Sequence, residues 1–369
     1  MSRPGGGRAW SLALLLLSVN AACGGYRPVP EFDPGDLKSP VLVAGTPLTL
    51  LWRSRPVRGP SAPLAVDATS VYVGGSDRRV VAVDLQSGRT RWAVRVSGTL
   101  VGGVLQSGDL VYAATDQPGG KVHAFRTISG SEAWSRTTGY IQSPLALVDG
   151  KLIGMTRQNQ VIALNAATGL FAWRRPLPTS RYAPVPLGAG GDVLISSYDS
   201  LYRVRVSDGK VTLRRRAPGA ITAGWRAFGN LLVAGTGDSL VVAVDPDSLT
   251  EQWRVRLDAP VLTLPAAAGD TLYAVTQVGS LYRIVTREGG ANAEPLQRTP
   301  WPATGRPEVI GPWVLIGASD GRLRAYSLPD GELTWSTQLG RPVELGAFAL
   351  PDSGFLIFGG RGDLQRMRP

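Results

Sequence analysis

The side chains that most often perform chemistry are scarce in this chain of 369 residues. It contains one histidine, His123, and one cysteine, Cys23. A histidine-based triad or a zinc site with several histidines would have to be built on His123 alone. The acidic residues Asp84, Asp116 and Asp245 lie at turn or repeat positions, without the converging oxygens that calcium requires. The sequence therefore predicts a protein that is not an enzyme and that has no catalytic residue, cofactor or metal site.

Cys23 belongs to a segment that predicts export and covalent modification. Arg3 and Arg8 precede an apolar stretch over residues 10–19, and two alanines stand directly before Cys23. This order is typical of a secretory signal peptide, and the apolar stretch is too short to span a membrane. A cysteine after small residues in this place resembles a bacterial lipobox, although Asn20 stands where an aliphatic residue is usual. We expect Cys23 to be lipidated; ordinary cleavage nearby, which leaves a protein without lipid, is the alternative.

Charge is the other chemical signal, and almost all of the basic excess is arginine. The chain has 39 lysines and arginines against 28 acidic residues, a net charge of +11. Removal of Arg3 and Arg8 with the signal peptide leaves about +9. The densest basic run is Arg214, Arg215 and Arg216. We interpret it either as a solvated outer strand or as a docking patch for an acidic partner or anionic lipid head groups. Nucleic acid is not an expected partner of an exported protein.

The elements that position these residues follow from eight short apolar runs, which recur about every forty residues. Each run is rich in β-branched or aromatic residues and ends in small or turn-forming ones, a pattern typical of buried strands. A repeat of this length without a helical period is typical of the blades of a β-propeller. We therefore expect an all-β fold with eight blades of four antiparallel strands. The runs begin at Val71, Val111, Leu152, Leu194, Leu232, Leu272, Val314 and Phe355.

A small residue, a turn glycine and a tryptophan follow most runs at spacings of six and then four residues. The small residue is expected where neighbouring blades crowd together, and the glycine supplies the positive φ of a tight hairpin. The tryptophan falls on the outer strand, where its indole covers the gap between blades and donates its N–H to a backbone carbonyl. The repeat residues are Ala82, Gly88, Trp92, Ala124, Gly130, Trp134, Ala163, Gly169, Trp173, Ala243, Trp253, Ala325, Gly331 and Trp335.

Some repeats depart from this pattern. Leu249 stands at the glycine position before Trp253, and Leu213 and Leu296 stand where a tryptophan is expected. We expect irregular blades or a functional face near these two leucines. Trp225 lies outside the repeat frame, where it either contacts a partner or packs in the core.

The two ends of the chain are expected to meet in one blade. The last run is followed by one further strand, and the chain stops three residues after Arg366. Trp52 lies forty residues before Trp92, so its strand has no preceding repeat of its own. We expect this N-terminal strand to complete the eighth blade and to remove the free sheet edges of an open ring.

The segments Ala82–Trp92 and Ala163–Trp173 resemble the quinoprotein (PQQ-type) propeller repeat, Ala-x-Asp-x-x-Thr-Gly-x-x-x-Trp. The resemblance covers about residues 45 to 369. It implies the fold but not an activity, because this repeat occurs both in dehydrogenases and in non-catalytic scaffolds. The resemblance also implies what a quinone-dependent dehydrogenase needs, namely a vicinal cysteine pair and a calcium site. A chain with one cysteine cannot form that pair, and a PQQ-dependent dehydrogenase-like protein is kept only as an alternative.

The whole chain is expected to contain a signal peptide over residues 1–22, a lipidated cysteine and extended tether over 23–44, and a propeller over 45–369. This combination resembles the BamB-like lipoproteins of the outer-membrane barrel-assembly machinery. The resemblance implies a non-catalytic scaffold, lipid-anchored at the periplasmic face of the outer membrane and monomeric within a hetero-complex. Its implied partners are a barrel-assembly subunit and unfolded outer-membrane proteins. A propeller lipoprotein with another protein partner, in surface adhesion or sensing, is the alternative.

Overall fold

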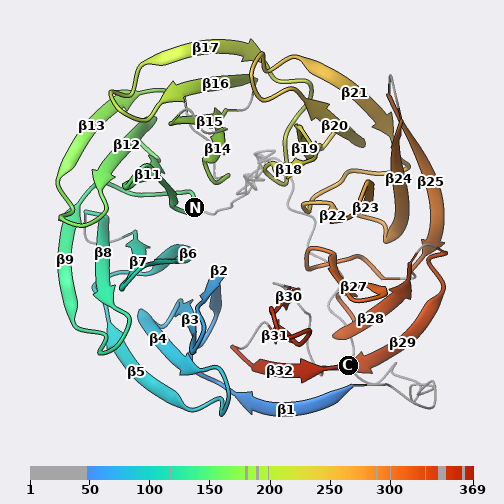
Figure 1. The fold of residues 1–369 in the computed structure, drawn as a ribbon, viewed down its shortest axis with the longest axis horizontal. Coiled ribbons are helices and arrows are strands. Elements are labelled where there is room, and N and C mark those ends of the chain that lie inside the picture. Colours follow the sequence, from blue (N-terminus) through green and yellow to red (C-terminus); the bar gives the residue numbers. More distant parts are fainter. Residues whose placement is uncertain are drawn as a thin grey trace, which may run out of the picture. The chain divides into compact units, whose positions relative to one another are not determined.

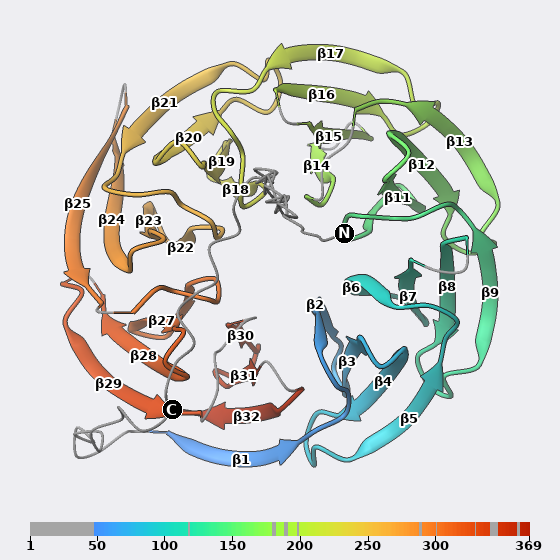
Figure 2. The same ribbon diagram turned by 180° about the vertical axis from the view of Figure 1, so that it is seen from behind.

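Strands and turns make up the described part of the chain. The computed structural model describes residues 48–369 apart from residues 117–118, 179–181, 188–190, 198, 288–289, 300, 329, 340–345 and 360–361. No helix in these residues is long and apolar enough to cross a membrane. The strands form eight four-stranded antiparallel sheets. Figures 1 and 2 show, from two opposite sides, that these sheets are the blades of a closed ring. The predicted eight-bladed β-propeller is therefore confirmed.

Successive strands of the chain pair with one another, so each blade except the last is one continuous segment. In each of these seven blades the first strand lies innermost and the fourth lies outermost (Figure 1). Blade 1 consists of β2 (Pro60–Val66), β3 (Ser70–Gly75), β4 (Arg79–Asp84) and β5 (Thr90–Arg95). Blade 2 consists of β6 (Leu100–Ser107), β7 (Leu110–Thr115), β8 (Lys121–Arg126) and β9 (Glu132–Thr137). Blade 3 consists of β10 (Ala146–Val148), β11 (Lys151–Thr156), β12 (Gln160–Asn165) and β13 (Phe171–Pro176).

The remaining blades keep this order. Blade 4 consists of β14 (Val185–Leu187), β15 (Asp192–Ser196), β16 (Ser200–Arg205) and β17 (Val211–Arg216). Blade 5 consists of β18 (Arg226–Phe228), β19 (Leu231–Gly235), β20 (Leu240–Val244) and β21 (Glu251–Arg256). Blade 6 consists of β22 (Ala266–Ala268), β23 (Thr271–Val275), β24 (Ser280–Arg287) and β25 (Gly290–Arg298). Blade 7 consists of β26 (Glu308–Ile310), β27 (Trp313–Gly317), β28 (Arg322–Ser327) and β29 (Leu333–Gln338).

Blade 8 joins the two ends of the described chain. It consists of β30 (Ala347–Ala349), β31 (Phe355–Phe358), β32 (Leu364–Arg368) and, as its outermost strand, β1 (Thr49–Ser54). The pairing of β1 with β32 is antiparallel and places Trp52 opposite Arg366. The prediction that an N-terminal strand completes the last blade is therefore confirmed.

The core of the propeller lies between the blades. The described residues contain eight buried apolar clusters, and each cluster draws its side chains from two neighbouring blades. Because side chains alternate along a strand, one blade serves two clusters. In β3, for example, Val71 and Val73 pack toward blade 8 and Tyr72 packs toward blade 2. Every blade is thus needed for the core on both of its sides.

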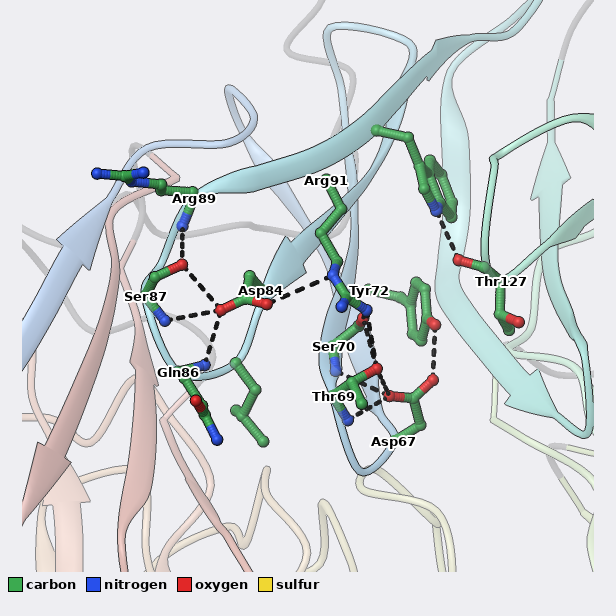
Figure 3. Close-up of polar contacts among 12 residues, drawn as sticks. Asp67, Thr69, Ser70, Tyr72, Asp84, Gln86, Ser87, Arg89, Arg91 and Thr127 are labelled. Carbon is green, nitrogen blue, oxygen red and sulfur yellow. Dashed lines mark hydrogen bonds and ion pairs between the residues drawn. The ribbon is translucent and has the colours of Figure 1, made fainter.

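The repeat residues meet at the joint between two blades. The Trp92 indole N–H donates to the carbonyl of Thr127 in the next blade at 2.7 Å (Figure 3). Gly130 of that blade lies under the indole, where a Cβ would come within 2.7 Å of the ring. Three further tryptophans make the equivalent hydrogen bond: Trp52 to Leu85, Trp134 to Ala166 and Trp173 to Val206. The repeat therefore both covers the joint and fixes its polar contact.

The leucine substitutions occur in matched places across joints. Leu213 occupies the tryptophan position of blade 4, and Leu249 occupies the glycine position of blade 5, and both belong to one apolar cluster. A smaller outer side chain is thus matched by a larger one in the facing turn. In blade 6 the bulky residue is Leu296, which lies against Gly331 of blade 7. Both joints stay packed although the tryptophan is missing.

Candidate protein-interaction site

Five arginines form a basic surface on two neighbouring outer strands, which we call the basic rim. They are Arg174 and Arg175 of β13 and Arg214, Arg215 and Arg216 of β17. All five side chains are exposed, and neither strand carries an acidic residue. Figure 1 shows β13 and β17 one after the other along the outer edge of the ring. The basic rim thus presents a net positive surface across blades 3 and 4.

The guanidinium groups of the basic rim are held by neutral partners. Arg174 stacks over the Phe171 ring at 3.6 Å, and Arg175 donates to the carbonyl of Asp208 at 3.0 Å. Arg214 lies over the Tyr202 ring at 5.5 Å. Within the described part of the chain, none of the five forms an ion pair.

Two arginines on other outer strands differ in this respect. Arg254 of β21 pairs with Glu251, and Arg53 of β1 pairs with Asp363 at 3.4 Å. Apart from an electrostatic interaction of Arg175 with Asp208, the charge of the basic rim is therefore left for a partner, whereas the charges of Arg254 and Arg53 are neutralised locally.

Arg214, Arg215 and Arg216 were predicted from the sequence as a possible partner contact, whereas Arg174 and Arg175 were not. Arg174 and Arg175 pair with Ile162 and Val161, as Arg214 and Arg215 pair with the corresponding Tyr202 and Leu201 of the next blade. Equal positions in neighbouring repeats lie next to each other in the ring. The signal that could have found Arg174 and Arg175 is their position directly after Trp173, which matches Arg214 and Arg215 after Leu213.

Trp225 lies far from the basic rim in the fold. It precedes β18, an innermost strand, whereas β17 is an outermost strand. Its side chain is 6% exposed and packs with Leu187 and Leu232, and its indole N–H donates to Ser196 Oγ at 2.7 Å. Trp225 also lines a cavity of about 380 Å³. The structure therefore does not bring Trp225 together with Arg214–Arg216, and a partner contact of Trp225 stays a prediction.

His123 is a buried residue of β8. Its ring stacks on Phe125 at 5.8 Å, and its Nδ1 lies 3.1 Å from a carboxylate oxygen of Glu132. Burial lowers the pKa of His123, while the contact with Glu132 acts in the opposite direction. Among the residues that the structure describes, no group of three or more His, Cys, Asp or Glu side chains is placed to hold a metal ion. Cys23 lies outside the described residues, and its lipidation stays a prediction.

Comparison with known families gives one match over most of the propeller. The family model described as "Outer membrane protein assembly factor BamB" matches residues 46–225 and 211–349. A protein of that name from Nitrosomonas eutropha is 30% identical over 130 residues, which are 34% of this chain and 31% of that protein. Another from Burkholderia pseudomallei is 28% identical over 316 residues, which are 82% of this chain and 74% of that protein. The chain thus spans about a third of the first relative and about three quarters of the second.

Two solved structures share the fold. The crystal structure of BamB from Moraxella catarrhalis has a TM-score of 0.73 at 16% identity, and the match covers 87% of this chain and 98% of that one. The quinohemoprotein alcohol dehydrogenase from Comamonas testosteroni has a TM-score of 0.65 at 14% identity and covers 87% of this chain and 76% of the enzyme. A BamB protein and an alcohol dehydrogenase thus share this fold, and fold alone does not select between the two kinds of protein.

Proposed function

Because this chain belongs to the family described as outer membrane protein assembly factor BamB, we propose that it acts in the assembly of outer-membrane β-barrel proteins. In this proposal the propeller is a non-catalytic scaffold that docks on the barrel-assembly complex. The observation that carries the proposal is the match of the family model across blades 1 to 7. The names of the relatives, which are assembly factors, favour this role over that of a quinone-dependent dehydrogenase.

The proposal places the protein in the periplasm, at the inner face of the outer membrane. Its anchor is a lipid on Cys23, and residues 24–44 are the tether that connects the lipid to the propeller. The protein is a monomer within a hetero-complex. Unfolded outer-membrane proteins, which pass through the periplasm, are its second class of partner.

The basic rim is the docking surface in this proposal, and its partner is an acidic protein surface. Five exposed guanidinium groups that form no ion pair within the described residues favour association with negative charge and discriminate against basic partners. Arginine also supports interfaces through its planar donors, which hold carboxylates in two hydrogen bonds. Charges of this kind act mainly on the association rate, so the interaction should weaken with salt.

Affinity capture of the tagged protein from solubilised envelopes of its own host tests this proposal. The expected result is co-purification of a barrel subunit that carries periplasmic domains. Replacement of Arg174, Arg214 and Arg215 by Gln should reduce its recovery at least fivefold. The matched control replaces Arg79, Arg89 and Arg95 of blade 1, which are equally exposed, and should leave recovery unchanged.

Other outcomes separate the alternatives. Loss of recovery in both triple variants would indicate a general charge effect and would overturn the basic rim as the docking surface. Absence of any barrel subunit, with labelling of the protein at the cell surface, would overturn the assembly role. Saturable binding of pyrroloquinoline quinone with calcium would contradict the non-catalytic scaffold.

A further inference from the structure

A cavity of about 380 Å³ lies where the innermost ends of the blades converge, and we call it the central chamber. Seven of the eight blades contribute side chains or backbone to it. Its lining is mainly apolar and aromatic, with Arg306 as its one charged lining residue among those the structure describes. Other lining residues are Pro63, Pro144, Tyr182, Trp225, Leu264 and Phe348. Apolar cavities with a few placed polar groups are the usual form of a small-ligand site.

Arg306 of the chamber has two charged neighbours that do not themselves line it, Arg226 and Glu308. Arg306 is stacked over the Phe348 ring at 5.0 Å and lies 3.5 Å from a carboxylate oxygen of Glu308. Arg226 directly follows Trp225, and its charge interacts with those of both Arg306 and Glu308. Arg226 and Glu308 occupy the same position on the innermost strands of blades 5 and 7. Arg226 and Glu308 begin β18 and β26, and the small Ala266 begins the intervening β22.

One donor on each of these two arginines is not satisfied by the protein. Nε of Arg226 and Nε of Arg306 are both buried and have no hydrogen-bond acceptor among the described residues. Burial lowers the pKa of Arg226, which reflects the cost of holding a guanidinium there. A buried charged donor without an acceptor is strongly unfavourable, and a bound anion is a common reason for it.

The three charged groups at the chamber leave a net charge of +1, which one further negative group would balance. Arg226 and Arg306 contribute two positive charges, and Glu308 contributes one negative charge. Glu308 does not satisfy either Nε atom, and its Oε2 accepts no hydrogen bond. A carboxylate is the planar acceptor that guanidinium groups bind best, and the aromatic lining suits an apolar body attached to it.

We propose that the central chamber binds an apolar carboxylate, with its anionic end on Arg306, close to the charge of Arg226, and its apolar body on Trp225, Tyr182 and Phe348. This site is separate from the basic rim and goes beyond the proposed assembly role. The same chemistry occurs in a small aromatic acid and in the free carboxyl terminus of a polypeptide. Both sources are ligands of this class, and the experiment distinguishes them.

Calorimetric titration of the intact propeller with N-acetyl-phenylalanine and with its uncharged amide tests the proposal. The carboxylate is expected to bind at least tenfold more tightly than the amide. Arg226→Gln should reduce that difference to about threefold or less, whereas the exposed control Arg95→Gln should leave it unchanged. Phe348→Ala should weaken both probes by a similar factor, because it removes apolar contact and no charge. A far-ultraviolet spectrum and a melting curve of each variant confirm that it is folded.

Three results would overturn the proposal: no saturable binding of either probe, equal affinity for acid and amide, or an undiminished difference in Arg226→Gln. An octapeptide that ends in phenylalanine identifies the source of the ligand. If its free acid binds more tightly than N-acetyl-phenylalanine, the chamber takes a polypeptide end; if it binds more weakly, the ligand is a small acid. Capture of the barrel subunit by Arg226→Gln should equal that of the natural chain, so failure here is distinguishable from failure of the assembly role.

Discussion

Single side chains cap the outer hairpins of the propeller. Asp84 Oδ1 accepts from the backbone N–H and from the hydroxyl of Ser87, both at 2.8 Å (Figure 3). Asp245 makes the same two contacts with Ser248 in blade 5, at 2.7 and 2.8 Å. In blade 3 the capping residue is Asn165, which accepts from the Thr168 N–H at 3.0 Å. The capping position of these hairpins therefore accepts asparagine as well as aspartate.

Replacement of Asp84 and Asp245 by Asn should flatten the dependence of stability on pH. The hydrogen bonds from Ser87 and Ser248 lower the pKa of both carboxyl groups in the folded protein. A lowered folded-state pKa gives stability that is complete above the unfolded pKa and is lost as pH falls through the folded pKa. Urea denaturation at intervals from about pH 6 to about pH 3 measures this loss. The natural chain should lose more stability over that range than the double variant; equal losses would contradict the assignment.

Gly130 is required at its joint for two physical reasons that can be separated. Its φ is +71°, and a Cβ there would lie 2.7 Å from the Trp92 ring. Gly108 has a similar φ of +59° and nothing within 4 Å of a Cβ. Gly108→Ala should therefore cost only backbone strain, about 1–2 kcal/mol. Gly130→Ala should cost about 1–3 kcal/mol more, because it also overpacks the joint.

Urea or thermal unfolding of the two glycine variants gives this difference directly. The structural role of the Trp92–Gly130 contact would be disproved by equal destabilisation of both variants. Restoration of stability in the double variant Trp92→Leu, Gly130→Ala would support it, because blade 4 and blade 5 use a larger turn residue against a leucine.

At the scale of elements, each outer strand is matched to the turn of the next blade. Leu213 of β17 and Leu249 of the blade 5 turn belong to one apolar cluster, in the places of tryptophan and glycine. Leu249 has a φ of +54°, which is unfavourable for leucine and persists because its side chain is 2% exposed. The two departures from the repeat are therefore one coupled feature of the joint.

Leu213→Trp alone should destabilise the propeller by about 1–3 kcal/mol, since the indole has no room beside Leu249. Leu249→Gly in the same chain should recover that loss, because it restores the combination found at Trp92 and Gly130. A double-mutant cycle measured by chemical denaturation should give a coupling of about 0.5–3 kcal/mol. Additive effects would show that the two leucines do not share one packing site.

At the scale of the whole propeller, stability depends on closure of the ring through β1. The Trp52 indole N–H donates to the Leu85 carbonyl at 2.9 Å, and Arg366 donates to the same carbonyl at 2.7 Å. Arg55 of the following segment bonds Asp363 at 2.8 Å. These contacts connect blade 8 to blade 1 across more than 280 residues, as the separation of Arg366 from Leu85 shows. Closing so long a loop lowers the conformational entropy of the whole chain that lies between the two contacts.

A chain that begins at Arg55 lacks β1 and should unfold at a lower temperature than one that begins at Leu48. It should also self-associate, because β32 then presents an unpaired edge. Differential scanning calorimetry and sedimentation velocity measure the two effects. The closure argument fails if the two chains have the same midpoint and the same sedimentation coefficient.

The blades, their number and the strand that closes the ring were all predictable from the sequence. This was possible because each strand pairs with its neighbour in the chain, so strand periodicity and turn residues such as Gly130 repeat with the structure. The same periodicity placed Trp92 and its equivalents at the joints. Leu249 and Leu213 were visible as departures, but their mutual compensation required knowledge of which turn each outer strand faces.

The side chains from distant blades that share a site became known only from the three-dimensional structure. Arg306 and Phe348 stand 42 residues apart in the sequence, yet their side chains stack because eight blades close around one axis. Closure of the ring fixes the distance between side chains on separate innermost strands. No local pattern contains that distance, since it depends on the curvature of the complete ring. The blades are therefore a property of the sequence repeat, and the central chamber is a property of their closure.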